Sequence, residues 1–204
     1  MSSVSAAVLT DRAWAPPTDR TKAVARDAVL VLGFALLTAG LAQIELHLSF
    51  TPVPITGQTL GVLLAGGALG SMRGGISQLL YWGMGLIGLP FYAGGEGGWS
   101  NGTGATMGYF VGFIVAAFIV GRLAERQQDR SLSTSLAAMA LGSVVIYIFG
   151  AVWLAYDLHI PVATGETNAL GLGVTPFLIG DLLKLALAGA LLPAAWAIAN
   201  RNHD

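Results

Sequence analysis

The chain has 204 residues, of which 54% are hydrophobic and only 10% are charged, and its formal net charge is −1. Apolar runs recur along most of its length, and a water-soluble domain could not solvate that much apolar surface, so the composition indicates an integral protein of a lipid bilayer. The sequence has no cysteine, which excludes a disulfide framework, a thiol nucleophile and a cysteine-based metal site. The histidines, His47, His159 and His203, lack metal-ligand spacing, and nothing in the sequence indicates a cofactor or a nucleic-acid partner.

Residues 1–23 are expected to form a polar tail, because they lack an apolar run long enough for a cleaved signal. The membrane domain is then expected to cover residues 24–200. Its first helix, roughly residues 24–46, carries Ala35 and Ala39 four positions apart. Small residues at this spacing give a helix a face that another helix can approach closely.

Two prolines, Pro52 and Pro54, prevent a helix over residues 51–56, which are expected to form a stiff loop or a re-entrant lid. A short, glycine-rich helix follows at residues 58–70, and another helix is expected at residues 74–92. The first of these two helices either spans the membrane or is only half-inserted.

Glycine occupies seven of the sixteen positions 93–108, a segment that also holds Trp99 and Asn101. It is either a flexible connector or a loop whose exposed backbone and aromatic side chains close over a ligand. Three more helices complete an all-α, polytopic bundle of six transmembrane helices: residues 106–123, residues 136–156 and residues 176–199.

The basic residues predict an orientation, because cytoplasmic loops carry an excess of Lys and Arg. With six helices, all ten Lys and Arg residues except Lys184 fall on one side of the membrane. The protein is therefore expected in the plasma membrane or inner membrane of a cell, with both of its termini on the cytoplasmic side. The proline-rich loop, the glycine-rich loop and the start of the last helix then share the outer face.

The last helix carries two opposite charges, Asp181 and Lys184, one helical turn apart. Pro176 at the first helical position and Thr175 as a cap predict where this helix begins. An Asp or a Lys inside a membrane helix costs about 2.5–3.5 kcal/mol, so the two charges must be compensated by each other or by a polar ligand. The pair is either a structural lock between helices or part of a ligand site, and the second interpretation is favoured because intramembrane charges are usually functional.

A pocket under the two outer loops would place this ion pair near amide, hydroxyl and aromatic side chains. Such a combination suits a small polar molecule with an apolar body and does not suit a bare ion. The chain has no phosphate-binding loop of the Gly-x-x-x-x-Gly-Lys-Ser/Thr type, so energy for transport would come from another protein. The candidate pocket residues, besides the ion pair, are Thr56, Gln58, Tyr81, Tyr92, Trp99, Asn101 and Tyr109.

Four stretches of this sequence together resemble the BioY family, the biotin-binding substrate components of energy-coupling-factor (ECF) transporters. They are SFTPVPITGQTLGVLLAGGALG at 49–70, GGISQLLYWGMGLIGLPFYAGGEGG at 74–98, GATMGYFVGF at 104–113 and GDLLK at 180–184. The resemblance implies a six-helix protein that captures biotin from the outer side. It also implies a membrane-embedded coupling protein and two ABC-type ATPase subunits as partners.

The resemblance also suggests roles for individual residues. Asp181 and Lys184 match the polar pair that contacts biotin, and Asn101 and Tyr109 lie in the matching loop and helix start. The resemblance gives Ala35 and Ala39 the role of meeting the coupling protein. The chain departs from the usual family pattern over residues 104–109, where a Pro and a Gly are replaced.

Three other functions are weighed against biotin capture. One is the transport of a different vitamin on the same architecture, and another is a purely structural or assembly role with the ion pair holding helices together. The third is an intramembrane aspartyl protease that pairs Asp157 with Asp181, but Leu178 stands where the usual protease motif has a glycine. The sequence leaves self-association into homo-oligomers open.

Overall fold

The computed structural model describes residues 8–201, which are mostly helical, so the predicted all-α class is confirmed. Strands β1 (Glu45–Leu46) and β2 (Ile55–Thr56) pair antiparallel in a small hairpin that the sequence did not predict. Two 3₁₀ turns also occur, η1 (Ala93–Gly95) and η2 (Thr175–Phe177). The α-helices are α1 (Leu9–Ala13), α2 (Arg20–Ala42), α3 (Gln58–Leu69), α4 (Ser71–Leu86), α5 (Trp99–Thr103), α6 (Met107–Glu125), α7 (Leu132–Leu158), α8 (Ala169–Gly173) and α9 (Leu178–Arg201).

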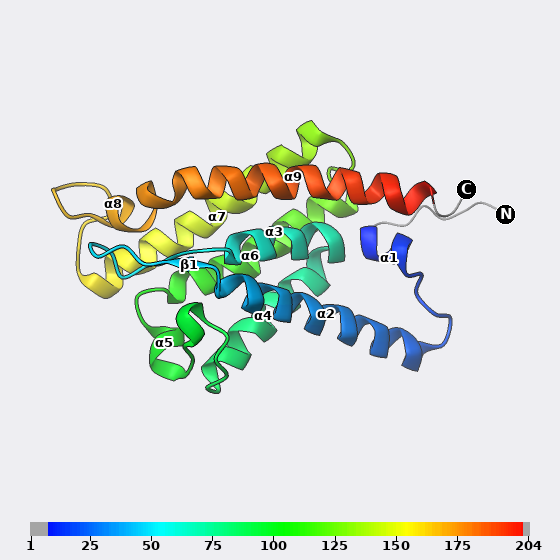
Figure 1. Cartoon of the computed structure of the whole chain (residues 1–204), viewed down its shortest axis with the longest axis horizontal. Helices are drawn as coiled ribbons and strands as arrows, with labels where there is room; N and C mark the ends of the chain where they lie inside the picture. Colours follow the sequence, from blue (N-terminus) through cyan, green and yellow to red (C-terminus); the bar gives the residue numbers. More distant parts are fainter. Residues whose placement is uncertain (1–7, 202–204) are drawn as a thin grey trace.

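The helices α2, α3, α4, α6, α7 and α9 pack together along the long axis of the molecule (Figure 1). Helix α1 and the last turn of α9 meet at one end, which we call the terminal end, where Arg12 Nε donates to Asn200 Oδ1 at 3.1 Å. The β-hairpin, α5 and α8 lie at the opposite end, which we call the cavity end (Figure 1). The chain thus separates its loops of unusual composition from its termini.

Four segments of the described chain are long and apolar enough to cross a membrane: α2, α6, α7 and the stretch Ala169–Arg201 that contains α9. Helices α3 and α4, with 12 and 16 residues, reach only about 18 and 24 Å at about 1.5 Å per residue. The predicted count of six membrane spans therefore stays a prediction. Exposed Ile179, Leu182 and Leu183 on α9 show that apolar side chains cover its outer surface.

Helix α3 occupies the interior of the bundle because its glycines permit close helix packing. A Cβ on Gly61 would lie 2.9 Å from Thr38 Oγ1 of α2, and a Cβ on Gly66 would lie 2.6 Å from the Ala117 carbonyl oxygen of α6. Both distances are shorter than side-chain contacts allow. The glycine-rich composition that predicted this helix is therefore explained by backbone contact on two sides.

A network of four charged residues fastens the terminal end; we call Asp11, Arg26, Asp27 and Arg73 the terminal cluster. Arg73 bonds both carboxylate oxygens of Asp11, at 2.9 and 3.0 Å, and also bonds Asp27 at 3.0 Å. Arg26, whose side chain is almost fully buried, bonds Asp11 and Asp27 at 2.9 Å each. Burial opposes ionisation of Asp11, but the hydrogen bonds from Arg73 and Arg26 outweigh it, so the pKa of its carboxyl lies below the usual value. These contacts join α1, α2 and α4.

Several predicted boundaries differ from the observed ones. Residues 8–23, expected as part of a polar tail, contain α1 and the first turn of α2, which begins at Arg20 because the Asp19 carboxylate accepts the Lys22 amide at 2.9 Å. The tail's first seven residues and His203 lie outside the described residues. Thr175 does not cap α9; its hydroxyl donates to the Leu170 carbonyl at 3.1 Å, and a 3₁₀ turn precedes the helix.

Candidate functional site

A cavity of about 270 Å³ opens at the cavity end. The β-hairpin region and the first residues of α3 form one wall, and the glycine-rich segment with the start of α6 forms another. Side chains from α7, η2 and α9 complete the lining. The proline-rich and glycine-rich loops therefore both border the cavity, as the sequence predicted for loops that could contact a ligand.

The charged pair of α9 lies in this lining. Lys184 Nζ is 2.6 Å from Asp181 Oδ1, as the one-turn spacing predicted, and Asp181 is only 8% exposed. Two further donors reach the same carboxylate: Thr59 Oγ1 of α3 donates to Oδ1 at 3.0 Å, and the Tyr147 hydroxyl of α7 donates to Oδ2. We call Thr59, Tyr147, Asp181 and Lys184 the cavity cluster. All four of its residues line the cavity.

A second polar group lies where the β-hairpin meets α3. The amide of Gln58 donates from Nε2 to the Tyr81 hydroxyl at 2.5 Å and accepts at Oε1 from Thr56 Oγ1 at 2.7 Å. Thr56 and Gln58 line the cavity, whereas Tyr81 is fully buried behind them. The hydrogen bonds hold the Gln58 side chain in place and still leave it one N–H for a ligand.

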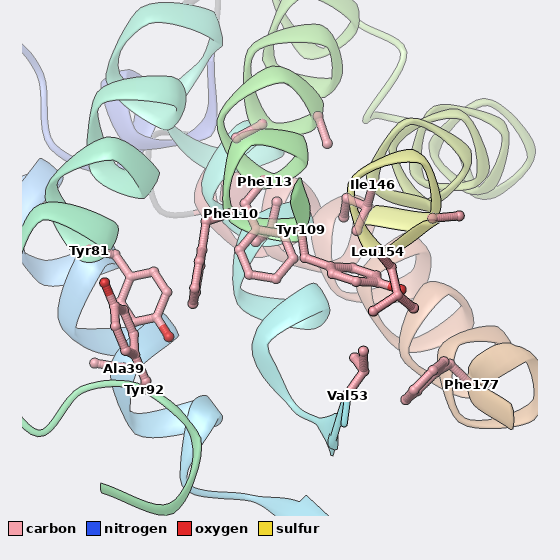
Figure 2. Packing of buried hydrophobic residues seen from close by; sticks show 14 of the residues in the cluster. Ala39, Val53, Tyr81, Tyr92, Tyr109, Phe110, Phe113, Ile146, Leu154 and Phe177 are labelled. Carbon is pink, nitrogen blue, oxygen red and sulfur yellow. The ribbon is translucent and has the colours of Figure 1, made fainter. Parts of the chain in front are cut away.

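Aromatic side chains form the apolar wall between these polar groups. The rings of Tyr92 and Phe110 lie 4.7 Å apart between centroids, and Phe113 meets Phe110 edge-on at 5.9 Å. Figure 2 shows Tyr81 and Tyr92 close together beside Phe110, with Tyr109 and Phe113 on the same helix α6. The Tyr109 hydroxyl donates to the Gly173 carbonyl at 2.6 Å and so ties α6 to α8. This wall can receive the apolar body of a ligand.

The glycine-rich segment contributes Asn101 but not Trp99. Asn101 lines the cavity, and its side-chain amide donates to the Gly97 carbonyl at 3.1 Å, which leaves its oxygen available as an acceptor. Trp99 is 71% exposed and is not among the lining residues. The structure therefore does not place Trp99 in the lining of this cavity, because short helix α5 puts neighbouring residues on different sides, and a role of Trp99 in ligand binding stays a prediction.

The alanine pair of the first helix is not on a free surface. Ala35 and Ala39 are 0% and 6% exposed and belong to the chain's own core, beside α3 and α4. In this arrangement the small-residue face brings helices of the same chain together. The expected contact of these two alanines with a partner protein stays a prediction.

Sequence reasoning missed two members of the cavity cluster, Thr59 and Tyr147. Thr59 directly follows Gln58, and Tyr147 lies near the middle of a long apolar helix, a position that could have been flagged as a polar group within a membrane span. Within residues 8–201, no group of three or more His, Asp or Glu side chains could hold a metal ion. The cavity thus offers the Asp181–Lys184 ion pair, the side chains of His47 and Glu96, several hydroxyls and amides, and an aromatic wall.

Comparisons with known proteins agree on one family. A family model described as the BioY family matches residues 13–201. The biotin transporter BioY of Rhizobium etli is 39% identical over 174 residues, covering 81% of this chain and 90% of the relative. Its counterpart in Rhodobacter capsulatus is 35% identical over 174 residues, covering 80% of this chain and 90% of the relative.

A solved structure has the same fold. It is the crystal structure of the S-component for biotin from an ECF-type ABC transporter, with a TM-score of 0.76 and 26% sequence identity. The match covers 87% of this chain and 94% of that one. The similarity of fold therefore extends over most of the chain.

Proposed function

The chain belongs to the BioY family, and from this premise we propose that it captures biotin in the cavity described above as the substrate-binding component of an ECF-type transporter. The observation that carries the proposal is the Asp181–Lys184 pair, which lies in the wall of a cavity whose lining also holds aromatic rings, neutral polar groups and the titratable side chains of His47 and Glu96. Biotin combines a ureido group, an apolar sulfur-containing ring with an aliphatic chain, and a carboxylate. Each of these parts finds a matching surface in the cavity.

The family assignment identifies a transporter component and not an enzyme, and the site geometry agrees. A protease would need a second carboxylate beside Asp181 to share a proton. Its observed hydrogen-bond partners are instead Lys184, Thr59 and Tyr147. Asp157, the residue considered as the second aspartate, lies near the end of α7 and does not line the cavity.

The charge balance of the cavity cluster favours the ureido end of biotin over its carboxylate. Asp181 and Lys184 already compensate each other at 2.6 Å, so a ligand carboxylate placed on Lys184 would also face the Asp181 carboxylate. A neutral ureido group avoids this repulsion, with its carbonyl accepting from Lys184 and an N–H donating to Asp181. The biotin carboxylate would then point away from the ion pair, and the lining also holds the titratable side chains of Glu96 and the exposed His47.

We propose that the terminal end faces the cytoplasm and that the cavity opens to the outside of the cell. The terminal end gathers the basic residues Arg26, Arg73 and Arg122, and the positive-inside rule places such an end in the cytoplasm. Delivery of biotin to the inside would use a membrane-embedded coupling protein and two ABC-type ATPase subunits as the energising module.

Calorimetric titration of the purified, detergent-solubilised chain with biotin tests the proposed function. Saturable one-site binding is expected for the wild type, with a large loss for Asp181→Asn and wild-type affinity for the matched control Asp157→Asn. If the folded wild type releases or absorbs no heat at any biotin concentration, biotin is not its ligand. Biotin amide, which lacks the free carboxylate, should still bind if the ureido group meets the ion pair.

A further inference from the structure

The Asp181 carboxylate has little hydrogen-bonding capacity left for a ligand. Its two oxygens offer about four lone-pair positions. Oδ1 accepts from Lys184 Nζ at 2.6 Å and from Thr59 Oγ1 at 3.0 Å, and Oδ2 accepts from the Tyr147 hydroxyl. Three of the four positions are therefore filled by the chain itself, and the remaining one is on Oδ2.

Lys184, in contrast, has unused hydrogen-bond donors. Its ammonium group carries three N–H donors, and one of them is directed at Asp181. The vacant acceptor on Asp181 and the free donors on Lys184 thus lie side by side in the cavity wall. This arrangement matches one edge of an amide-like group, in which an N–H and a carbonyl oxygen lie next to each other.

We infer that the cavity cluster recognises a single N–H together with the adjacent carbonyl of a cyclic urea, and that Thr59 and Tyr147 are positioning residues that impose this choice. The inference rests on the proposed function and specifies which atoms of the ligand the site binds. The two hydroxyls fill the other acceptor positions of Asp181 and hold its carboxylate in one orientation. The second N–H of the urea, on the far side of the carbonyl, is left to groups outside this cluster.

The two biotin derivatives methylated on one or the other ureido nitrogen test this inference. Losing a hydrogen bond to a charged group typically costs about 1.5–3 kcal/mol, so methylation of the nitrogen that meets Asp181 should weaken binding roughly 10- to 100-fold more than methylation of the other nitrogen. The ratio of the two dissociation constants therefore measures the selectivity of the cluster. If the wild type lost the same affinity for both derivatives, the inference that the cluster binds a single N–H would be wrong.

Tyr147→Phe tests the positioning role with the same ratio. The variant frees a second acceptor position on Oδ2 and removes one restraint on the carboxylate, so the ratio should fall by about tenfold while binding of biotin itself weakens. Tyr156→Phe, on the same helix but 72% exposed and outside the cavity lining, is the matched control and should leave both quantities unchanged. A role in packing alone would weaken both derivatives equally and keep the ratio constant, which would refute the positioning role.

A second variant keeps the test decisive if Tyr147→Phe does not fold. Thr59→Val removes the other hydroxyl donor from Asp181 with nearly the same side-chain shape, and it should reduce the same ratio. A wild-type ratio in Thr59→Val would contradict the inference. Failure of the wild type to bind biotin would instead refute the proposed function, so the two failures are distinguishable.

Discussion

The molecule holds partly buried ion pairs at both of its ends, and they differ in what surrounds them. In the terminal cluster, Arg26 donates to two carboxylates and to the carbonyls of Thr10 and Trp14, and Arg73 donates to the same two carboxylates. In the cavity cluster, the ion pair lies in the wall of a cavity, with free donors on Lys184. Similar charge pairs thus hold helices together at one end and can recognise a ligand at the other. The difference is that only the cavity cluster has unused hydrogen-bond donors that face a cavity.

The largest expected effect comes from breaking the cavity pair. Lys184→Met leaves the Asp181 carboxylate without its charge partner and removes the donor for the ureido carbonyl. Truncating one partner of a buried, hydrogen-bonded charge pair typically costs about 2–5 kcal/mol, so biotin affinity should fall roughly 30-fold to several thousand-fold. Calorimetry in detergent measures this, with Arg73→Met in the terminal cluster as the control that should keep wild-type affinity.

If Arg73→Met weakened biotin binding as much as Lys184→Met, the proposed division between a fastening and a recognition site would be wrong. The same would follow if Lys184→Met bound biotin normally. The first result would mean that both clusters affect binding only through the stability of the bundle, and the second would mean that Lys184 does not contribute to biotin binding.

Exchanging the two charges of the cavity pair separates recognition from structural support. The double variant Asp181→Lys with Lys184→Asp keeps an ion pair at the same spacing on α9 but reverses donor and acceptor. The thermal stability of the bundle should tolerate the exchange, whereas the affinity for biotin should be at least about tenfold lower than that of the wild type. Thermal unfolding and calorimetry on the same sample test both parts, and normal biotin affinity would show that the pair only holds helices together.

The terminal cluster should govern stability instead. Arg73→Met leaves Asp11 and Asp27 with Arg26 as their remaining cluster partner and removes the bidentate bond that attaches α1. Because these charges are partly exposed, a loss of about 1–3 kcal/mol is expected, which lowers the midpoint of thermal unfolding by several degrees. A matched surface variant, Arg122→Met, should change the midpoint less, since its side chain is 62% exposed. An unchanged midpoint in Arg73→Met would show that the cluster does not fasten the terminal end.

The sequence predicted contacts between residues that are close along the chain, but it did not predict contacts between distant residues. The Asp181–Lys184 contact follows from helix geometry within one turn, and the start of α3 at Gln58 was predicted correctly. The bonds of Asp181 to Thr59 and Tyr147 connect residues 122 and 34 positions apart, which no local pattern encodes. The pattern of a single helix also does not say which neighbour covers it, so the sequence did not predict that the alanine pair of α2 packs beside α3 and α4 of the same chain.

The smallest expected effect is a pH dependence confined to the terminal end. The pKa of Asp11 in the folded chain lies below the ordinary value of 3.8, because the hydrogen bonds from Arg73 and Arg26 outweigh the cost of burial. A carboxyl with a lowered folded pKa stabilises the fold fully above its unfolded pKa, and this contribution disappears as the pH falls through the folded value. The wild type should therefore lose stability below about pH 4 more steeply than Asp11→Asn, which lacks the titrating group. Unfolding midpoints measured for both proteins between about pH 6 and pH 3 test this, and parallel curves would mean that Asp11 does not contribute to the fastening through its charge.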